Sequence, residues 1–346
     1  MARRPARPRG RASAGPPQAP RRAARPRRPA TRPGGPAIAA PFVIPRTRAD
    51  VEMEVGGRRV RLTNLDKIFF PEIGATKGDL LQYYVTVAPV LLPHLRDRAM
   101  VMKRYPNGAS GDFFFMKRAP RPRPEWITTC AIEHGSGSVI DFPVVDDLAA
   151  LMWVINLGCI DLNQWYARCD DVDRPDYLHF DLDPVGEVPF ATVLEAARTL
   201  NETLRALRMP TWVKTTGSRG VHVYVPIVRG PTQKQVWDVS KTIAVDVARR
   251  HPRLLTAVYK KAARPAGRVL VDFNQNAWGR TLASVYSVRP RPRATVSTPV
   301  TWDEVARGFE IEDFRMDNVP ARLAKLGDLW APLDTSHARF DLRALA

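Results

Sequence analysis

The spacing of apolar residues predicts an α+β chain from residue 51 onward. Apolar side chains that recur every three or four positions predict four helices, the first ending before Pro93, over residues 77–92, 146–157, 190–208 and 233–250. Runs rich in β-branched and aromatic residues predict strands over residues 100–105, 113–118, 177–184, 211–215, 221–228 and 269–275. Residues 51–62 predict a hairpin that turns at Gly56-Gly57. From residue 176 the order strand, helix, hairpin, helix, strand predicts a small sheet with helices packed on one face.

Most of the positive charge lies in the first 50 residues. They hold 13 Arg, no Lys and one acid, Asp50, and so contribute 12 of the 18 net positive charges. They also hold 11 Pro, which together with the charge predicts a disordered tail. Such a tail either adds salt-sensitive affinity for nucleic acid or only solvates the chain. A start codon assigned too early, with translation beginning nearer Met53, is a third explanation.

The cysteines and the hydropathy indicate a compartment. Cys130, Cys159 and Cys169 form no Cys-x-x-Cys pair, which argues against a zinc site and a disulfide framework and favours a reducing environment. No apolar run reaches the ~18–20 residues of a membrane span, and the N-terminus lacks the apolar segment of a secretory signal. We therefore expect a cytoplasmic chain, bacterial and nucleoid-associated, with no membrane partner.

The strand over residues 177–184 carries the main candidate chemistry. Because side chains alternate along a strand, Asp181 and Asp183 share a face with His179 and lie about 6.6 Å apart along the backbone. Two adjacent carboxylates favour a divalent cation, and oxygen ligands favour Mg²⁺ or Mn²⁺. Asp272 interrupts an apolar strand and would be a third ligand if that strand is a neighbour. The alternative for each acid is a solvent-facing edge strand.

A glycine-bounded turn follows, over residues 216–222. It combines backbone N–H groups with Ser218, Arg219 and His222, a set of donors that suits a triphosphate. Arg280 and Arg289 are candidate phosphate clamps. The alternatives are an ordinary hairpin turn and solvated surface arginines.

Several segments, in this order, resemble the polymerase domain of bacterial ligase D, which belongs to the archaeo-eukaryotic primase superfamily. They are LTNLDKIFFPEIGATKGDLLQYY (62–84), MKRYPNG (102–108), FFFMKRAP (113–120), HFDLDP (179–184), TTGSRGVHVYVP (215–226), VLVDFNQN (269–276) and SVYSVRP (284–290). The resemblance covers roughly residues 55–330. It implies a primase-polymerase fold of class α+β, with an RRM-like catalytic sheet flanked by helices and an N-terminal α/β subdomain. The expected divisions are a tail at 1–50, the N-terminal part at 51–175, the catalytic part at 176–335 and a C-terminal tail at 336–346.

The resemblance also implies roles for individual residues. The metal-binding catalytic triad would be Asp181, Asp183 and Asp272. The nucleotide site would comprise Ser218, Arg219, Gly220, His222, Gln275, Arg280, Arg289 and Asn163. The DNA-binding residues would be Lys67 and Lys77 at the 5′-phosphate of a downstream strand, Lys103, Arg104 and Asn107 along the DNA groove, and Phe114 and Phe115 stacking on a template base. The alternation of a strand predicts that at least one residue of Phe113-Phe114-Phe115 belongs to the core.

Two residues depart from the family pattern. Asn163 stands in Asp161-Leu162-Asn163, where the family commonly has Glu-x-His, and Met116 replaces a polar residue beside the phenylalanine pair. Asn can donate and accept hydrogen bonds but cannot carry charge, so metal preference, rate or sugar selectivity would differ. With no further domain in sight, these departures suggest a standalone paralogue.

The sequence thus predicts a DNA-templated nucleotidyl transferase that fills gaps or extends 3′ ends in break or excision repair. The expected cofactors are two Mn²⁺ or Mg²⁺ ions with NTP or dNTP substrates, and family resemblance favours ribonucleotides. The expected partners are DNA with a 5′-phosphate, the end-binding protein Ku and a separate ligase, and the chain is expected to be a monomer. The alternatives are a primase that starts strands de novo and a non-catalytic DNA-end-binding protein.

Overall fold

The structure, a computed structural model, describes residues 42–45, 48–334 and 339–345. The described residues form one compact unit that mixes helices and sheets as the sequence predicts. The predicted disordered tail lies for the most part in residues 1–41, outside the described residues.

The larger sheet has six strands in the order β15-β16-β12-β14-β13-β17, and all its pairs are antiparallel except β15–β16. Its strands are β12 (Tyr177–Val185), β13 (Trp212–Thr215), β14 (Val221–Pro226), β15 (Leu255–Thr256), β16 (Arg268–Asp272) and β17 (Pro299–Val300). The four inner strands confirm the prediction. The edge strands β15 and β17 have two residues each, too few for a pattern to reveal.

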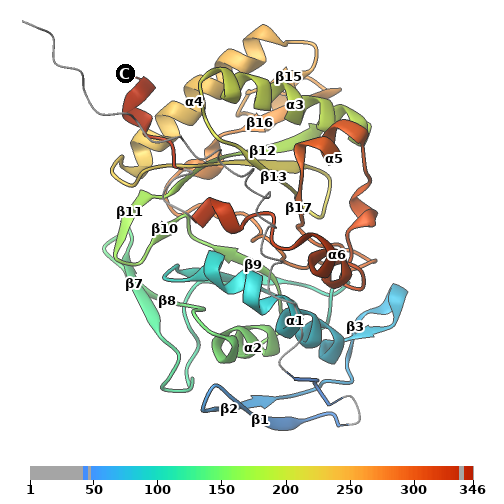
Figure 1. Cartoon of the computed structure of the whole chain (residues 1–346). Coiled ribbons are helices and arrows are strands. Elements are labelled where there is room, and N and C mark those ends of the chain that lie inside the picture. The colour runs from blue at the N-terminus through green and yellow to red at the C-terminus, as the bar shows by residue number, and fades with distance from the viewer. Residues whose placement is uncertain (1–41, 46–47, 335–338, 346) are drawn as a thin grey trace, which may run out of the picture. The chain divides into compact units, whose positions relative to one another are not determined.

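Two long helices cover one face of this sheet, as predicted (Figure 1). They are α3 (Phe190–Ala206) and α4 (Gln233–Arg250). The predicted apolar stripe of α3 is the side that is buried, through Val193, Leu200 and Leu204. The opposite face of the sheet is therefore left to the acidic residues of β12.

The remaining elements lie mostly before β12. They are β1 (Val51–Val55), β2 (Arg58–Leu62), β3 (Ile68–Phe70), β4 (Ala75–Thr76), α1 (Lys77–Leu95), β5 (Met100–Arg104), β6 (Phe114–Met116), β7 (Thr129–Glu133), β8 (Val139–Pro143), α2 (Leu148–Asn156), β9 (Cys159–Gln164), β10 (Ala167–Arg168) and β11 (Asp171–Pro175), with α5 (Trp302–Arg307) and α6 (Val319–Leu326) near the end. The β1–β2 hairpin turns at Gly56-Gly57 as predicted. A second sheet, β6-β5-β9, has three strands.

The predicted end of α1 before Pro93 is wrong. The helix runs to Leu95 with Pro89 and Pro93 inside it. A proline removes one helical hydrogen bond, but Leu91 and Leu95 on either side of Pro93 are fully buried. Packing therefore holds the helix together through a position where local preference would end it. No helix in the described ranges combines the length and apolarity needed to cross a membrane.

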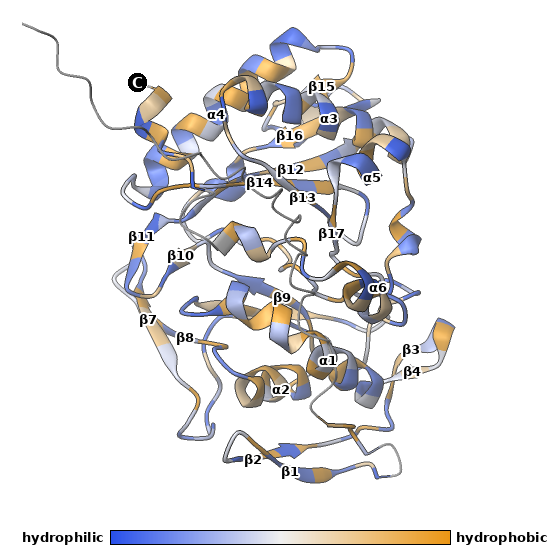
Figure 2. Ribbon diagram, viewed as in Figure 1, coloured by the Kyte–Doolittle hydropathy of each residue, from blue (hydrophilic) through white to orange (hydrophobic). Residues whose placement is uncertain are grey.

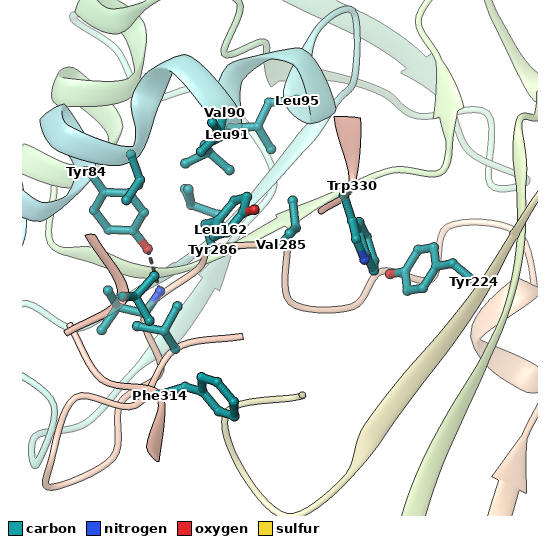
Figure 3. Close-up of a cluster of buried hydrophobic side chains, with 14 of the residues drawn as sticks. Tyr84, Val90, Leu91, Leu95, Leu162, Tyr224, Val285, Tyr286, Phe314 and Trp330 are labelled. Carbon is teal, nitrogen blue, oxygen red and sulfur yellow. Dashed lines mark hydrogen bonds between the residues drawn. The ribbon is translucent and has the colours of Figure 1, made fainter. Parts of the chain in front are cut away.

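One apolar core joins the elements before and after β12. Leu91 of α1, Tyr224 of β14 and Trp330 belong to it, and the rings of Tyr224 and Trp330 lie 4.9 Å apart (Figure 3). Helix α2 is apolar over most of its surface (Figure 2), and residues 149–155 are all buried. The two sheets are thus held against a shared interior.

The end of the predicted disordered tail is part of this core, so the boundary at residue 50 is wrong. Ile44 is 1% exposed, and its backbone N–H donates to Oε1 of Gln82. The carbonyl of Ala49 accepts from the N–H of Leu65. Average composition conceals this because one buried isoleucine anchors an otherwise Arg- and Pro-rich stretch.

The expectation against disulfides is also wrong. Cys130 of β7 and Cys169, which follows β10, form a disulfide with their Cα atoms 5.8 Å apart. The two residues are 39 positions apart, so their pairing follows from the packing of the two hairpins and leaves no local signature. Cys159 is a buried free thiol.

A buried ion pair gives the first testable prediction. Arg98 donates from one guanidinium nitrogen to both carboxylate oxygens of Asp176 at 2.7 Å, and both side chains are almost fully buried. Burial favours the protonated acid, but Arg98 and Arg168 hold the pKa of Asp176 below its usual value. Arg98→Met leaves a buried carboxylate without this partner and should lower the free energy of unfolding by about 3–5 kcal/mol.

Urea unfolding followed by circular dichroism measures this loss. The double variant Arg98→Met/Asp176→Leu removes both charges and should recover most of the stability, because an apolar pair of similar volume replaces the ion pair. A double variant no more stable than Arg98→Met would contradict the charge argument.

Candidate active site

One row of side chains crosses the inner face of the larger sheet. The register places Asp181 of β12 opposite Asp272 of β16 on one side and opposite His222 of β14 on the other. His222 in turn lies opposite Lys214 of β13. Directly paired residues of antiparallel strands project to the same face, so two acids, a histidine and a lysine form a continuous line. Asp183, two positions along β12, shares that face.

The acids of β12 repel one another in the folded chain. Burial raises the pKa of Asp181 to about 7, and the charge of Asp272 adds to the rise. The charge of Asp181 raises the pKa of Asp183 to about 7, and burial contributes as well. Both carboxyls are therefore poised to gain from a nearby cation.

His222 is held by Lys214, which the sequence analysis did not single out. Lys214 is fully buried, and its Nζ lies 2.7 Å from His222 Nδ1 and 3.0 Å from the carbonyl of Ala283, with Ser297 Oγ as a third contact. Burial lowers the pKa of both Lys214 and His222. With Nδ1 accepting from Lys214, the proton of a neutral imidazole lies on Nε2, which is 3.2 Å from Asp181 Oδ1. A lysine within the apolar strand Trp212–Thr215 was the available signal.

The donor set fits a divalent cation. Asp181 Oδ1 is buried and has no hydrogen-bond partner among the described residues, because the approach of His222 lacks hydrogen-bond geometry. Within the same residues, no three His, Cys, Asp or Glu side chains are close enough to hold an ion as they stand. Asp272 accepts hydrogen bonds from the N–H of Asn274 and from Gln275 Nε2. Carboxylate oxygens that repel one another suit Mn²⁺ or Mg²⁺, and side-chain rotation would bring them together.

The turn over residues 217–220 lies directly against β12. A Cβ on Gly220 would come within 2.3 Å of the carbonyl oxygen of Leu182 and 3.0 Å of Asp183 Oδ1, so only glycine fits. The N–H groups of Ser218 and Gly220 both donate to Thr216 Oγ1 at 3.1 Å. These two donors, expected to serve a phosphate, are thus already used, and positive charge in the turn comes from side chains.

Most of the predicted nucleotide-site residues line one pocket of about 590 Å³. It brings together Asn163, Asp181, Asp183, Ser218, Arg219, His222, Gln275, Arg280 and Arg289 with Lys103 and Phe115, and adds Lys117, Asp161, Thr216 and Arg291. Asp272 and Gly220 stand beside the pocket without lining it. Arg291, which donates to Ser218 Oγ, was not predicted.

Asp161, which appeared in the sequence analysis only as part of the Asn163 segment, was not predicted to belong to the site either. It lies in β9, a strand whose six residues are all buried, and its Oδ2 is 3.3 Å from Lys103 Nζ. Its Oδ1 accepts from Arg289 Nε at 2.9 Å. An acid within a buried strand was the signal. Asn163 lines the pocket and donates to the carbonyl of Asp161.

The residues predicted to bind a 5′-phosphate form a second basic group. Lys67 Nζ donates to the carbonyl of Pro106 and to Asn107 Oδ1. Lys77 is buried at the start of α1 and donates to the carbonyl of Thr63. Burial lowers the pKa of Lys77 to about 8, and the like charges of Lys67 and Arg104 contribute, so the three cations lie close together. Lys67 is the exposed member of the group.

The prediction that at least one of Phe113, Phe114 and Phe115 is core is wrong. Their exposed fractions are 50%, 43% and 59%. The reason is that β6 is an edge strand whose two faces are both open. The guanidinium of Arg104 lies 5.2 Å from the ring of Phe114. Three exposed aromatic rings beside cations suit stacking on bases.

A carboxylate-bearing sheet face that meets a basic pocket is typical of enzymes that transfer nucleotidyl groups. The family described as LigD, primase-polymerase domain, matches residues 76–330. The chain therefore belongs to this family of DNA polymerase-type nucleotidyltransferases.

Individual relatives agree with this assignment. The multifunctional non-homologous end joining protein LigD of Mycolicibacterium smegmatis is 35% identical over 278 residues, which is 80% of this chain and 36% of that protein. The bifunctional LigD of Bacillus subtilis is 29% identical over 78% of this chain and 43% of that protein. The polymerase domain of Mycobacterium tuberculosis ligase D, solved in complex with DNA, has a TM-score of 0.75 at 31% identity and covers 80% of this chain and 99% of that chain. The chain thus spans less than half the length of the two LigD proteins.

The raised pKa values predict how stability depends on pH. Since folding raises the pKa of Asp183 from 3.8 to about 7, its contribution to stability is present below about pH 4 and is lost as the pH rises through 7. The lowered pKa of His222 makes its contribution to stability increase with pH instead. The pH dependence of wild-type stability alone therefore does not isolate the effect of Asp183. In EDTA, Asp183→Asn should raise Tm relative to wild type by an amount that grows between about pH 5 and pH 8.

Differential scanning fluorimetry at several pH values measures this difference. Mn²⁺ should raise the Tm of wild type more than that of Asp183→Asn at about pH 8. The exposed Asp238→Asn, on α4, is the matched control and should follow wild type. A Tm difference that is the same at every pH would contradict the repulsion between the acids.

Proposed function

We propose that this chain is a DNA-templated nucleotidyl transferase that extends a 3′-hydroxyl at gaps or broken ends. The observation that carries the proposal is the row Asp272–Asp181–His222–Lys214, which faces a pocket rich in arginine. The names of the LigD relatives describe non-homologous end joining, and a repair role of that kind extends to this chain as part of the proposal.

Asp181, Asp183 and Asp272 would hold two Mn²⁺ or Mg²⁺ ions. When bound, such ions activate the 3′-hydroxyl for attack on the α-phosphate and neutralise charge on the departing pyrophosphate. The chain supplies positioning: Arg219, Arg280 and the other pocket arginines pair with triphosphate oxygens. The bond from the 3′-oxygen to the α-phosphorus forms as the bond to pyrophosphate breaks.

His222 lies against Asp181 without needing charge. Its Nε2 is 3.2 Å from Asp181 Oδ1 but lacks hydrogen-bond geometry, and Lys214 fixes its tautomer from the other side. Since both groups are buried, water does not compete for these contacts. The row thus keeps Asp181 away from water while leaving Oδ1, which has no hydrogen-bond partner among the described residues, available to a cation.

DNA would be held at two further places. The three neighbouring cations Lys67, Lys77 and Arg104, here called the Lys67 group, would bind the 5′-phosphate of a downstream strand. Phe114 and Phe115 would stack on template bases. Stacking accepts any base, which suits a templated enzyme without sequence preference. Preference for ribonucleotides, and cooperation with Ku and a separate ligase, follow from family resemblance and remain part of the proposal.

Primer extension on a one-nucleotide gap with a 5′-phosphate tests the activity. With Mn²⁺ and NTPs or dNTPs, wild type should extend the primer by the templated nucleotide. Asp181→Asn should slow extension by at least about 10²–10³-fold, the loss typical of removing one stabiliser of transition-state charge. Asp238→Asn is the control and should match wild type. Tight DNA binding without extension by wild type would instead indicate an end-binding protein.

Lys67→Met tests the 5′-phosphate site separately. Wild type should bind gapped DNA with a 5′-phosphate about tenfold more tightly than the same DNA with a 5′-hydroxyl, as one charged hydrogen bond of ~1.5–3 kcal/mol provides. In Lys67→Met that ratio should fall toward one, whereas in Lys234→Met, an exposed lysine of α4, it should not change. Fluorescence anisotropy measures both affinities. A ratio that survives Lys67→Met would place the phosphate elsewhere.

A further inference from the structure

The sheet β6-β5-β9 carries a second row of side chains along the pocket wall. Its register places Lys103 of β5 opposite Phe115 of β6 and opposite Asp161 of β9. Directly paired residues share a face, and all three line the pocket. An aromatic ring, a cation and an acid are therefore fixed in order from the sheet edge inward.

Lys103 joins the aromatic end of this row to the acid. Its Nζ lies 4.1 Å from the ring centre of Phe113 and 5.8 Å from that of Phe115. The same nitrogen lies 3.3 Å from Asp161 Oδ2. A cation over an aromatic face is attracted to the ring, so any contact that moves or covers the rings changes the energy of this ammonium position.

Asp161 extends the connection to the triphosphate side. Its Oδ1 accepts from Arg289 Nε at 2.9 Å, and another nitrogen of Arg289 donates to the carbonyl of Thr216. The Asp161 side chain is only 2% exposed, so each carboxylate oxygen has a fixed cation and water does not substitute for either. The exposed phenylalanines are thereby linked to the glycine turn through one carboxylate.

The Asp161 carboxylate also holds the side chains of Lys103 and Arg289 in their orientations. Without it, Lys103 and Arg289 would repel each other across the pocket, and Arg289 would keep only its contact with Thr216. A change at Lys103 must therefore redistribute the charge available to Arg289. Such a shared partner is the physical requirement for coupling between two sites.

We propose that Asp161 is a positioning residue that couples a template base on the aromatic rings to triphosphate affinity at Arg289. This inference rests on the proposed function, because it assumes that a template base stacks on Phe113 or Phe115. A stacked base confines the rings and Lys103, and Asp161 then holds Arg289 toward the phosphates. By reciprocity, a bound triphosphate strengthens template stacking by the same factor.

The test must exclude direct base pairing between template and nucleotide. Inorganic triphosphate with Mg²⁺ is therefore the probe, since it has no base. Its affinity is measured by calorimetry with the protein saturated by gapped DNA that has either a base or an abasic site at the unpaired template position. The two DNAs carry the same charge, so the affinity ratio reports only what the protein transmits.

Wild type should bind triphosphate about fivefold or more tightly with the base than with the abasic site, within the usual range of coupling. Asp161→Asn should bring the ratio close to one, and Asp161→Glu, which keeps the charge, should restore it. Phe113→Leu should also abolish the ratio, because Lys103 loses the ring that a stacked base would confine. Asp238→Asn should retain the wild-type ratio.

The outcomes separate the two proposals. An affinity ratio of one in wild type, or the wild-type ratio in Asp161→Asn, would overturn the role of Asp161. It would leave the proposed transferase function intact. Binding of neither triphosphate nor gapped DNA by wild type would overturn the proposed function itself. Should Asp161→Asn fail to fold by circular dichroism, Phe113→Leu decides, because that side chain is half exposed and its loss spares the core.

Discussion

The repulsion among three acids on one largely buried sheet face constrains the whole site. Asp181 and Asp183 have pKa values near 7 because burial and the neighbouring carboxylates disfavour their charges. The chain offsets this only in part, through the charges of Lys214 and Arg289 at Asp181 and of Arg219 and Arg289 at Asp183. The negative charge that remains uncompensated favours cation binding on this face. An anionic substrate in the arginine-lined pocket would lie next to those cations.

Strand β5 shows how one element serves two sites. Lys103 and Arg104 are consecutive and so point to opposite faces, the first to the pocket and the second to the Lys67 group. The phenylalanines of β6 divide in the same way: Phe115 lines the pocket and Phe114 lies under Arg104. A gap has an unpaired template base on one side and a downstream 5′-phosphate on the other. The two-residue alternation of the strands thus places a cation and a ring on each face of this sheet.

Elements and residues with local signatures were predictable from the sequence. The bounds of α4 follow from its capping box and apolar spacing, and the acids of β12 follow from strand alternation. Lys214, Asp161 and the Cys130–Cys169 bond were not found. The first two carried a signal, a charge within an apolar strand, but their partners Ser297 and Arg289, like the second cysteine, are brought near only by the fold. Cross-strand register decides those partners, and tertiary packing sets the register. Pro93 within α1 was missed for the same reason, since buried leucines override a local preference.

The turn beside β12 determines which groups can meet a triphosphate. Thr216 Oγ1 already accepts from the N–H groups of Ser218 and Gly220, so side chains rather than these backbone groups would contact a triphosphate. Those side chains are chiefly arginines, which stay charged at every relevant pH and offer paired donors to phosphate oxygens. The acids differ from them, because Asp181 and Asp183 have pKa values of about 7. It follows that guanidinium groups would supply the pocket's affinity for anions, whereas its affinity for cations would develop only as those acids ionise.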